Sequence, residues 1–151
     1  MVGKTTGPEV RAQALFRDRF VGVVRAGHPL SKGKVTLARY AAAGHIRVAR
    51  PGSGKGPIDD ALAPLGMQRR VVTIVGGYSA ALALTRACDL VASVPEHHTG
   101  DLRAGLFSFA LPLTMPQITV SMLWHPRMDG DPAHRWLREC VREACARSAG
   151  K

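Results

Sequence analysis

The amino-acid sequence predicts an α/β domain with a mostly parallel sheet and flanking helices. Between residues 20 and 94, short β-branched runs alternate with segments of helical period, which is the pattern of successive strand–helix–strand units. Two of these runs end in glycine-rich turns that lead directly into a helix. The length of 151 residues fits one domain with room for two small lobes, and the apolar fraction of 46% is ordinary for a globular chain.

Local signals bound the strands and helices up to residue 94. Thr36 is placed as a helix N-cap, and Gly44 as the residue that ends the same helix. Pro57 is placed at the first position of a second helix, and Ser79 is placed as the N-cap of a third. Residues 1–10 show no clear period and are expected to form a tail or entry strand, and residues 11–19 are polar with Leu15 and Phe16 inserted. The expected strands are 20–25, 46–49, 70–75 and 90–94, and the expected helices are 37–43, 57–64 and 80–88.

Beyond residue 94 the pattern predicts a short helix, two strands and a long final helix. The short helix is expected at 97–104, and the strands at 107–113 and 117–124. Asp131 is placed as the N-cap of the final helix, with Pro132 at its first position. Apolar side chains recur on one side of that helix at the spacing of an amphipathic helix. They are Trp136, Leu137, Cys140, Val141, Ala144 and Cys145.

The two glycine-rich turns form the candidate ligand-binding region. The first, residues 50–56, leads into the helix that begins at Pro57, and the second, residues 76–79, follows the strand 70–75. Parallel strands put such turns at one edge of the sheet, beside helix N-termini whose amides attract anions. An ordinary strand–helix turn explains each residue taken singly, but two turns at one edge favour a ligand crevice. The candidate ligand-binding residues are Arg50, Gly52, Ser53, Gly54, Gly77, Tyr78 and Ser79.

A phosphate-binding interpretation of the first turn fails on its chemistry. A Walker A loop needs a hydroxyl residue after its lysine to hold magnesium. Here Gly56 follows Lys55, and Ala49 stands where the first glycine belongs. The residues Gly-Lys-Thr at positions 3–5 have the right ending, but no strand or glycine precedes them. Nucleotide hydrolysis is therefore not expected.

The sequence contains no other recognisable catalytic or metal-binding pattern. His97 and His98 are adjacent and would diverge on a helix, and the three cysteines lack paired spacing. No serine lies in a nucleophile elbow. Asp59 and Asp60 fall in the first turn of a helix, where the macrodipole favours carboxylates, and this role is preferred over a catalytic pair. The sequence thus predicts a protein that is not an enzyme, with no metal site and no cofactor.

Net charge and hydropathy indicate which classes of binding partner are possible for this chain. The net charge of +10 favours nucleic acid or small anions, although the cations are scattered and do not form one basic block. Solvated surface arginines explain the same charge. No apolar run approaches membrane-spanning length, and the polar start is not a signal peptide. We therefore expect a cytoplasmic protein with no membrane partner.

A series of short motifs follows a recognisable order along the chain. They are residues 15–21 (LFRDRFV), 24–30 (VRAGHPL), 56–59 (GPID) with Leu65–Gly66, 89–95 (DLVASVP), 111–113 (LPL), 124–127 (WHPR) and 131–138 (DPAHRWLR). Each motif is weak alone, but their order and spacing cover about nine tenths of the chain. In these motifs the sequence resembles the latter part of the effector-binding domain of LysR-type transcriptional regulators.

The resemblance implies a fold like that of type II periplasmic binding proteins, in which two α/β lobes enclose a ligand cleft. Crossovers between the lobes are expected at residues 10–20 and 94–95. The ligand-contacting positions of the family correspond to 50–54 and 77–79, which agrees with the glycine turns. One complete lobe and part of the other are expected. The implied divisions are an N-terminal tail and crossover (1–19), lobe II (20–94) and the C-terminal part of lobe I (95–151).

The resemblance also implies a regulatory function without catalysis. A small organic effector, expected to be a carboxylate or another anion, would bind in the cleft and change the closure of the lobes. The other implied partners are a second copy in a homo-oligomer, with a dimer expected, and DNA through a winged helix-turn-helix. That element has no counterpart in this sequence, so we expect a fragment or a truncated gene product. The alternative is an oligomerisation module that binds no ligand of its own.

Overall fold

The computed structural model describes residues 9–148 and divides the chain into two compact units. The larger unit runs from Arg19 to Pro116, and the smaller unit combines the described residues up to Asp18 with those from Gln117 onward. Each unit is described by itself. The tail expected at the N-terminus, and the Gly-Lys-Thr triplet within it, lie outside the described residues up to position 8.

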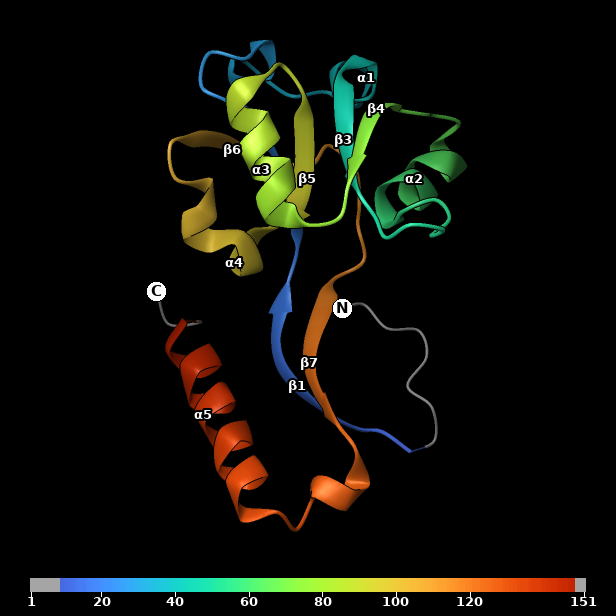
Figure 1. The fold of residues 1–151 in the computed structure, drawn as a ribbon. Coiled ribbons are helices and arrows are strands. Elements are labelled where there is room, and N and C mark those ends of the chain that lie inside the picture. The colour runs from blue at the N-terminus through green and yellow to red at the C-terminus, as the bar shows by residue number, and fades with distance from the viewer. Residues whose placement is uncertain (1–8, 149–151) are drawn as a thin grey trace. The chain divides into compact units, whose positions relative to one another are not determined.

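A five-stranded sheet organises the larger unit, in the order β4-β3-β5-β2-β6 (Figure 1). The pairs β3–β4 and β3–β5 are parallel, whereas β2 is antiparallel to both β5 and β6. The sheet is therefore mixed, which corrects the prediction of a mostly parallel sheet. The strands are β2 (Phe20–Arg25), β3 (Gly44–Val48), β4 (Arg70–Val75), β5 (Val91–Pro95) and β6 (Leu106–Ala110).

Short helices connect these strands. Thr36 caps the first of them, because its hydroxyl accepts a hydrogen bond of 3.2 Å from the Arg39 amide, as the sequence predicts. The α-helices are α1 (Leu37–Ala42), α2 (Pro57–Leu62), α3 (Tyr78–Ala87) and α4 (Glu96–Thr99). Single 3₁₀ turns cover Pro29–Ser31, Ala63–Leu65 and Gly100–Arg103.

Two apolar clusters hold the larger unit together. The first brings buried side chains of α3, among them Ala81 and Leu82, against Ile46 of β3 and against β2 and β5. The second brings Tyr40 of α1 and Leu62 of α2 against β2, β5 and β6. Apolar burial stabilises a fold roughly in proportion to the area removed from water. The sheet is therefore held between α3 and the pair α1 and α2.

The strand β6 belongs to the sheet of the larger unit because of a close fit across the ladder. Gly22 of β2 pairs with Phe109, and the Phe109 ring occupies the space where a side chain at Gly22 would stand. The sequence assigned residues 95–151 to the C-terminal part of lobe I, whereas the compact larger unit extends to Pro116. The difference arises because the β2–β6 pairing joins residues that lie far apart along the chain, which no local pattern indicates.

The smaller unit consists of a two-stranded antiparallel sheet and a long helix. Its strands are β1 (Arg11–Asp18) and β7 (Ile118–Trp124), and they pair in register from Arg11–Trp124 to Asp18–Ile118 with one irregularity after Ala14. A 3₁₀ turn, Pro126–Met128, precedes α5 (Pro132–Ser148). The strand β1 lies within residues 10–20, where the resemblance implies a crossover, although the residue pattern alone did not predict a strand there.

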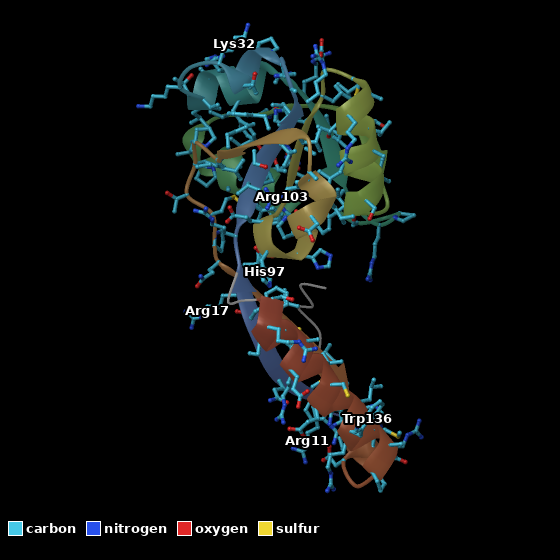
Figure 2. The ribbon with its side chains drawn as sticks, turned by 90° about the vertical axis from the view of Figure 1, so that its left-hand side faces the viewer. Arg11, Arg17, Lys32, His97, Arg103 and Trp136 are labelled. Atoms are coloured by element: carbon cyan, nitrogen blue, oxygen red, sulfur yellow. The ribbon has the colours of Figure 1, made fainter. Side chains whose placement is uncertain are left out.

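The helix α5 leaves much of its apolar side exposed within the described residues, although Cys140, Val141 and Cys145 are half-buried. None of its residues is buried, and Trp136, labelled in Figure 2, is 69% exposed. Leu137 beside it is 51% exposed. The predicted amphipathic stripe is thus present, but residues 9–148 supply no core for it. In this part of the chain, no helix has the length and apolar character needed to cross a membrane.

His45 of β3 is a fully buried polar side chain. Its ring is 0% exposed, lies edge-on to the Tyr40 ring with 4.6 Å between centroids, and places Nε2 2.7 Å from the Tyr40 carbonyl oxygen. A neutral ring with its proton on Nε2 donates to that carbonyl. Within residues 9–148 its Nδ1 has no hydrogen-bond partner. Burial lowers the pKa of His45 to about 4.

The substitution Gly22→Ala should destabilise the larger unit. A Cβ atom at this position would lie 2.3 Å from two atoms of the Phe109 ring, so the ring must move and the core is overpacked. We expect a loss of about 1–3 kcal/mol in the free energy of unfolding, measured by urea denaturation. Gly76→Ala is the matched control, because a Cβ there meets nothing within 4 Å. Equal midpoints for the two variants would contradict the close fit.

Acid should destabilise the fold between pH 6.5 and pH 4 through His45. In the unfolded chain the ring takes up a proton near pH 6.5, whereas in the folded chain it stays neutral down to about pH 4. The unfolded state therefore binds more protons in this window, and stability falls by up to about 3 kcal/mol as the pH drops. Urea denaturation at pH 7 and pH 4.5 measures the loss. His45→Gln keeps an N–H donor for Tyr40 and should reduce the pH dependence; identical pH slopes would refute the assignment.

Candidate functional site

The two predicted turns lie side by side at one edge of the sheet. The strands β3 and β4 run parallel with Val48 opposite Val75, and the Ala49 amide donates to the Val75 carbonyl at 3.0 Å. Each strand then enters its glycine-rich turn, and each turn opens a helix, α2 or α3. The prediction that both turns open at the same edge is confirmed. Ligand binding by their residues stays a prediction.

The first turn has a closed backbone and open surroundings. The Ser53 amide and hydroxyl both donate to the Arg50 carbonyl, at 3.1 and 2.7 Å. Gly52 has φ +77°, a left-handed conformation that side chains disfavour. A Cβ at Gly52 or Gly54 would meet nothing within 4 Å. Arg50, Gly52, Ser53 and Gly54 are all exposed, so their backbone is accessible to a ligand.

The second turn presents the uncapped N-terminus of α3. The helix begins at Tyr78, so Gly77 is its N-cap and no side chain accepts a hydrogen bond from the first amides. This corrects the prediction that Ser79 is the N-cap: Ser79 lies inside the first turn, and its side chain is exposed. No acidic residue lies in the first helical turn of α3. The positive end of the helix dipole is therefore neither capped nor neutralised.

A small cavity lies between the starts of α2 and α3. It has a volume of about 40 Å³, and Gly56, Pro57 and Tyr78 line it together with Phe20 of β2 and Ser93 of β5. Tyr78 is the one predicted site residue among its lining residues. The Ser93 hydroxyl is 2.7 Å from the Tyr40 hydroxyl, and burial raises the pKa of Tyr40. Phe20 and Ser93 could not be predicted as lining residues, because both fall inside apolar strands of the sequence.

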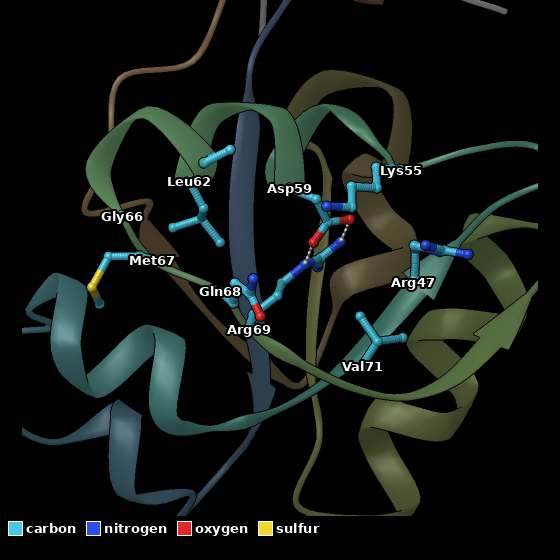
Figure 3. A pocket seen from close by; sticks show the side chains of 10 residues that line it. Arg47, Lys55, Asp59, Leu62, Gly66, Met67, Gln68, Arg69 and Val71 are labelled. Atoms are coloured by element: carbon cyan, nitrogen blue, oxygen red, sulfur yellow. Dashed lines mark hydrogen bonds and ion pairs between the residues drawn. The ribbon is translucent and has the colours of Figure 1, made fainter.

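A buried ion pair fixes the start of α2. Two nitrogens of the Arg69 guanidinium donate to the two carboxylate oxygens of Asp59, at 2.7 and 3.1 Å (Figure 3). The Arg69 and Asp59 side chains are 3% and 16% exposed. The same carboxylate accepts from the Gly56 amide at 3.3 Å, which caps the helix. Burial alone would raise the pKa of Asp59, but the hydrogen bonds and charge of Arg69 hold the pKa below its usual value. The predicted position of Asp59 and Asp60 in the first turn of the helix is confirmed, whereas the ion pair with Arg69 was not predicted.

The arrangement can bind an anion, and it provides no catalytic chemistry that we recognise. The site offers backbone amides and the Ser79 hydroxyl as hydrogen-bond donors, and the Arg50 guanidinium as a cation that also donates. The three cysteines are free and partly exposed. Within the described part of the chain, no three His, Cys, Asp or Glu side chains gather as metal ligands would.

Removal of the Arg69 guanidinium should be costly, because it leaves the Asp59 carboxylate buried without its partner. We expect Arg69→Met to lower the free energy of unfolding by about 3–5 kcal/mol. The double variant Asp59→Asn/Arg69→Met should recover much of the loss, since no unpaired charge remains. Urea denaturation measures both.

The Arg25–Asp89 pair is the control for this measurement. Its side chains are 38% and 66% exposed, so Arg25→Met should cost less than about 1 kcal/mol. If Arg69→Met cost no more than Arg25→Met, the buried pair would not have the structural role assigned to it.

Comparison with known proteins identifies the family. The model of the LysR substrate binding domain matches residues 1–146. The HTH-type transcriptional regulator SyrM of Rhizobium meliloti is 34% identical over 90% of this chain and 42% of its own length. The activators NagR of Ralstonia sp and NahR of Pseudomonas putida are each 30% identical, over 83% and 84% of this chain and 42% and 43% of their own lengths. The chain thus spans less than half the length of the curated relatives it matches.

Solved structures agree with the sequence matches. A probable transcriptional regulator from Pseudomonas aeruginosa superposes with a TM-score of 0.79 at 29% identity, over 93% of this chain and 46% of that chain. The regulatory domain of MexT, a transcriptional activator of the same organism, gives 0.77 at 26% identity, over 94% and 69%. The effector binding domain of QuiR in complex with shikimate shares the fold, with a TM-score of 0.72 at 15% identity over 93% and 67%.

The predicted α/β fold of the type II periplasmic-binding-protein kind is confirmed by these structures. The relatives named above are transcriptional activators and regulators, which are not enzymes. On the match of the family model to residues 1–146, the chain belongs to the LysR substrate-binding domain family.

Proposed function

We propose that this chain binds a small organic anion, most simply a carboxylate, at the edge of the sheet where its two glycine-rich turns meet. The observation that carries the proposal is the uncapped N-terminus of α3, which lies beside the exposed glycine-rich turn 50–56. The helix starts after Gly77 with no side-chain cap and no acidic residue in its first turn, and nothing stands within 4 Å of a Cβ placed at Gly76 or Gly77. Helix N-termini of this kind bind anions through their amides and dipole.

The proposed contacts follow from this geometry. The amides of the first turn of α3 and the Ser79 hydroxyl receive the carboxylate, and Arg50 at the rim contributes charge. The ring of Tyr78, half-buried against the core, offers an apolar face for the body of the ligand. Gly52, Ser53, Gly54 and Gly77 contribute accessible backbone. The shikimate held by the effector binding domain of QuiR supports a carboxylate as the ligand class.

In a longer regulator, the bound effector would control transcription. The relatives carry the description HTH-type transcriptional activator or regulator, and full-length CbnR has been solved with its target DNA. We propose that a domain outside these 151 residues contacts DNA and that effector binding biases the arrangement of the regulator. This proposal implies a cytoplasmic location, because the DNA that such a regulator controls lies there.

A second candidate function is assembly into a homo-oligomer without ligand binding. It is favoured by exposed apolar side chains on an edge strand: Val72 and Ile74 of β4 are 50% and 52% exposed. The α5 stripe adds Trp136 and Leu137. Edge strands and apolar patches of this kind are typical association surfaces. Sedimentation at rising concentration tests this function, and a monomer at every concentration would exclude it.

The substitution Ser79→Asp tests the ligand site directly. A carboxylate in the first turn favours the helix, so the fold should remain intact, but it repels an anion at the helix N-terminus. We expect affinity for the carboxylate that binds most tightly to fall by about tenfold or more. Isothermal titration with benzoate, shikimate and succinate measures the affinity. Ser79→Asn, which is neutral and of the same size as aspartate, is the matched control and should lose much less.

Two outcomes would count against the proposed function. One is that none of the three carboxylates gives a saturable heat with the unsubstituted chain. The other is that Ser79→Asp and Ser79→Asn bind the carboxylate equally well, because the charge at the start of α3 would then not matter.

A further inference from the structure

A second hollow opens beside α2 and shares Arg47 and Arg69 with the small cavity between the starts of α2 and α3. Its volume is about 650 Å³, within the usual range for small-molecule sites. Figure 3 shows it between α2, the segment that leads into β4, and the end of β3. None of the seven predicted site residues lines it. Of its lining residues, Lys55 belongs to the first glycine-rich turn, and Arg47 and the residues from Asp59 to Val71 lie outside both turns.

One part of the hollow is cationic. Arg47, Lys55 and Arg69 line it with a single carboxylate, that of Asp59. Arg69 holds both oxygens of this carboxylate, and the Gly56 amide donates to it as well. Within residues 9–148, the Nε of Arg47 is buried without a hydrogen-bond partner. A buried donor without an acceptor costs free energy that a bound anion would recover.

The remaining wall is mostly apolar and includes the polar side chain of Gln68. Leu62 is fully buried and Met67 is partly buried, and both pack in the cluster below the hollow. Figure 3 shows Met67 at the opposite end from Arg47, with Val71 across from the helix. Met side chains adapt well to varied apolar surfaces. The hollow thus presents unneutralised cations at one end and an apolar surface along its length.

We infer that this hollow is a second ligand site, built for an organic carboxylate with an apolar body. The Arg47 guanidinium and the Lys55 ammonium receive the carboxylate, with charge-assisted hydrogen bonds. The apolar body lies along Met67 and Val71. The Asp59–Arg69 pair forms a fixed wall, because both of its partners are committed to each other. Inorganic anions satisfy the cations without using the apolar surface, so they should bind less tightly.

Nuclear magnetic resonance of the labelled 151-residue chain tests this site, with benzoate as the probe. We expect saturable shifts of the Met67 methyl and the Gln68 side-chain amide, which lines the hollow. Arg47→Met and Lys55→Ala should each weaken binding by about tenfold, because each removes one of the two receiving cations. Lys34→Ala is the charge-matched control, since Lys34 is exposed and does not line the hollow. Acetate and inorganic phosphate should bind at least about tenfold more weakly than benzoate.

The same spectra separate this site from the one proposed at the turns. Ser79→Asp should weaken the binding that the backbone amides at positions 78 and 79 report by about tenfold or more and leave the shifts of Met67 and Gln68 in place. The inference is overturned if benzoate at about 20 mM leaves Met67 and Gln68 unshifted, or if the two cation variants bind as the unsubstituted chain does. It is also overturned if phosphate matches benzoate, or if Met67 and Gln68 shift with protein concentration alone, because a second copy would then fill the hollow.

Discussion

The bidentate pair between Asp59 and Arg69 is the interaction on which the ligand-binding edge depends. It joins the first turn of α2 to the residue before β4, and the same carboxylate caps the helix through the Gly56 amide. With 3% and 16% of the side chains exposed, water competes little for either charge. Buried pairs of this kind contribute modest net stability, but they disfavour alternative arrangements in which one charge loses its partner. The pair therefore holds the start of α2 in one position relative to the sheet.

Because the ion pair holds the start of α2, the glycine-rich turns have no packing role of their own. A Cβ at Gly52, Gly54, Gly76 or Gly77 would meet open space, so packing does not demand glycine at these positions. Only Gly52 has a backbone conformation that requires it. Binding residues are commonly found on loops that a rigid scaffold positions. Here β3 and β4 are the scaffold, and their parallel register brings the two turns together.

The sequence could predict features that depend on neighbouring residues. The strands from β2 to β7 and the helices α1, α2 and α5 were placed to within a few residues, because β-branched runs, caps and prolines act locally. The common edge of the two turns also followed, since it requires only that β3 and β4 be parallel. Features set by distant partners have no signal in the local residue pattern. The strand β1 carries Arg11 and Gln13 among its apolar residues and is defined by β7, about a hundred residues later. The antiparallel direction of β2 and the end of the larger unit at Pro116 depend on β6 in the same way.

The candidate site divides along the same line. The turn residues could be predicted as candidates because glycine, serine and a following helix form a local signal. Arg47 and Arg69 carry no such signal in the sequence. Arg47 lies in an otherwise apolar strand, and Arg69 pairs with a carboxylate ten residues earlier across a helix and a turn. The capping of α3 was also misplaced, because a glycine N-cap leaves no side-chain signal and Ser79 supplied a false one.

The two units differ in the extent of their apolar cores, and this difference affects the ligand sites. The larger unit has buried clusters between its sheet and its helices. The smaller unit offers α5 only a two-stranded sheet, and no residue of that helix is buried. Two strands alone are marginally stable in water. Both proposed ligand sites are built entirely from residues between Arg19 and Pro116. Their chemistry therefore depends on the part of the chain that has its own core, whatever surface comes to cover α5.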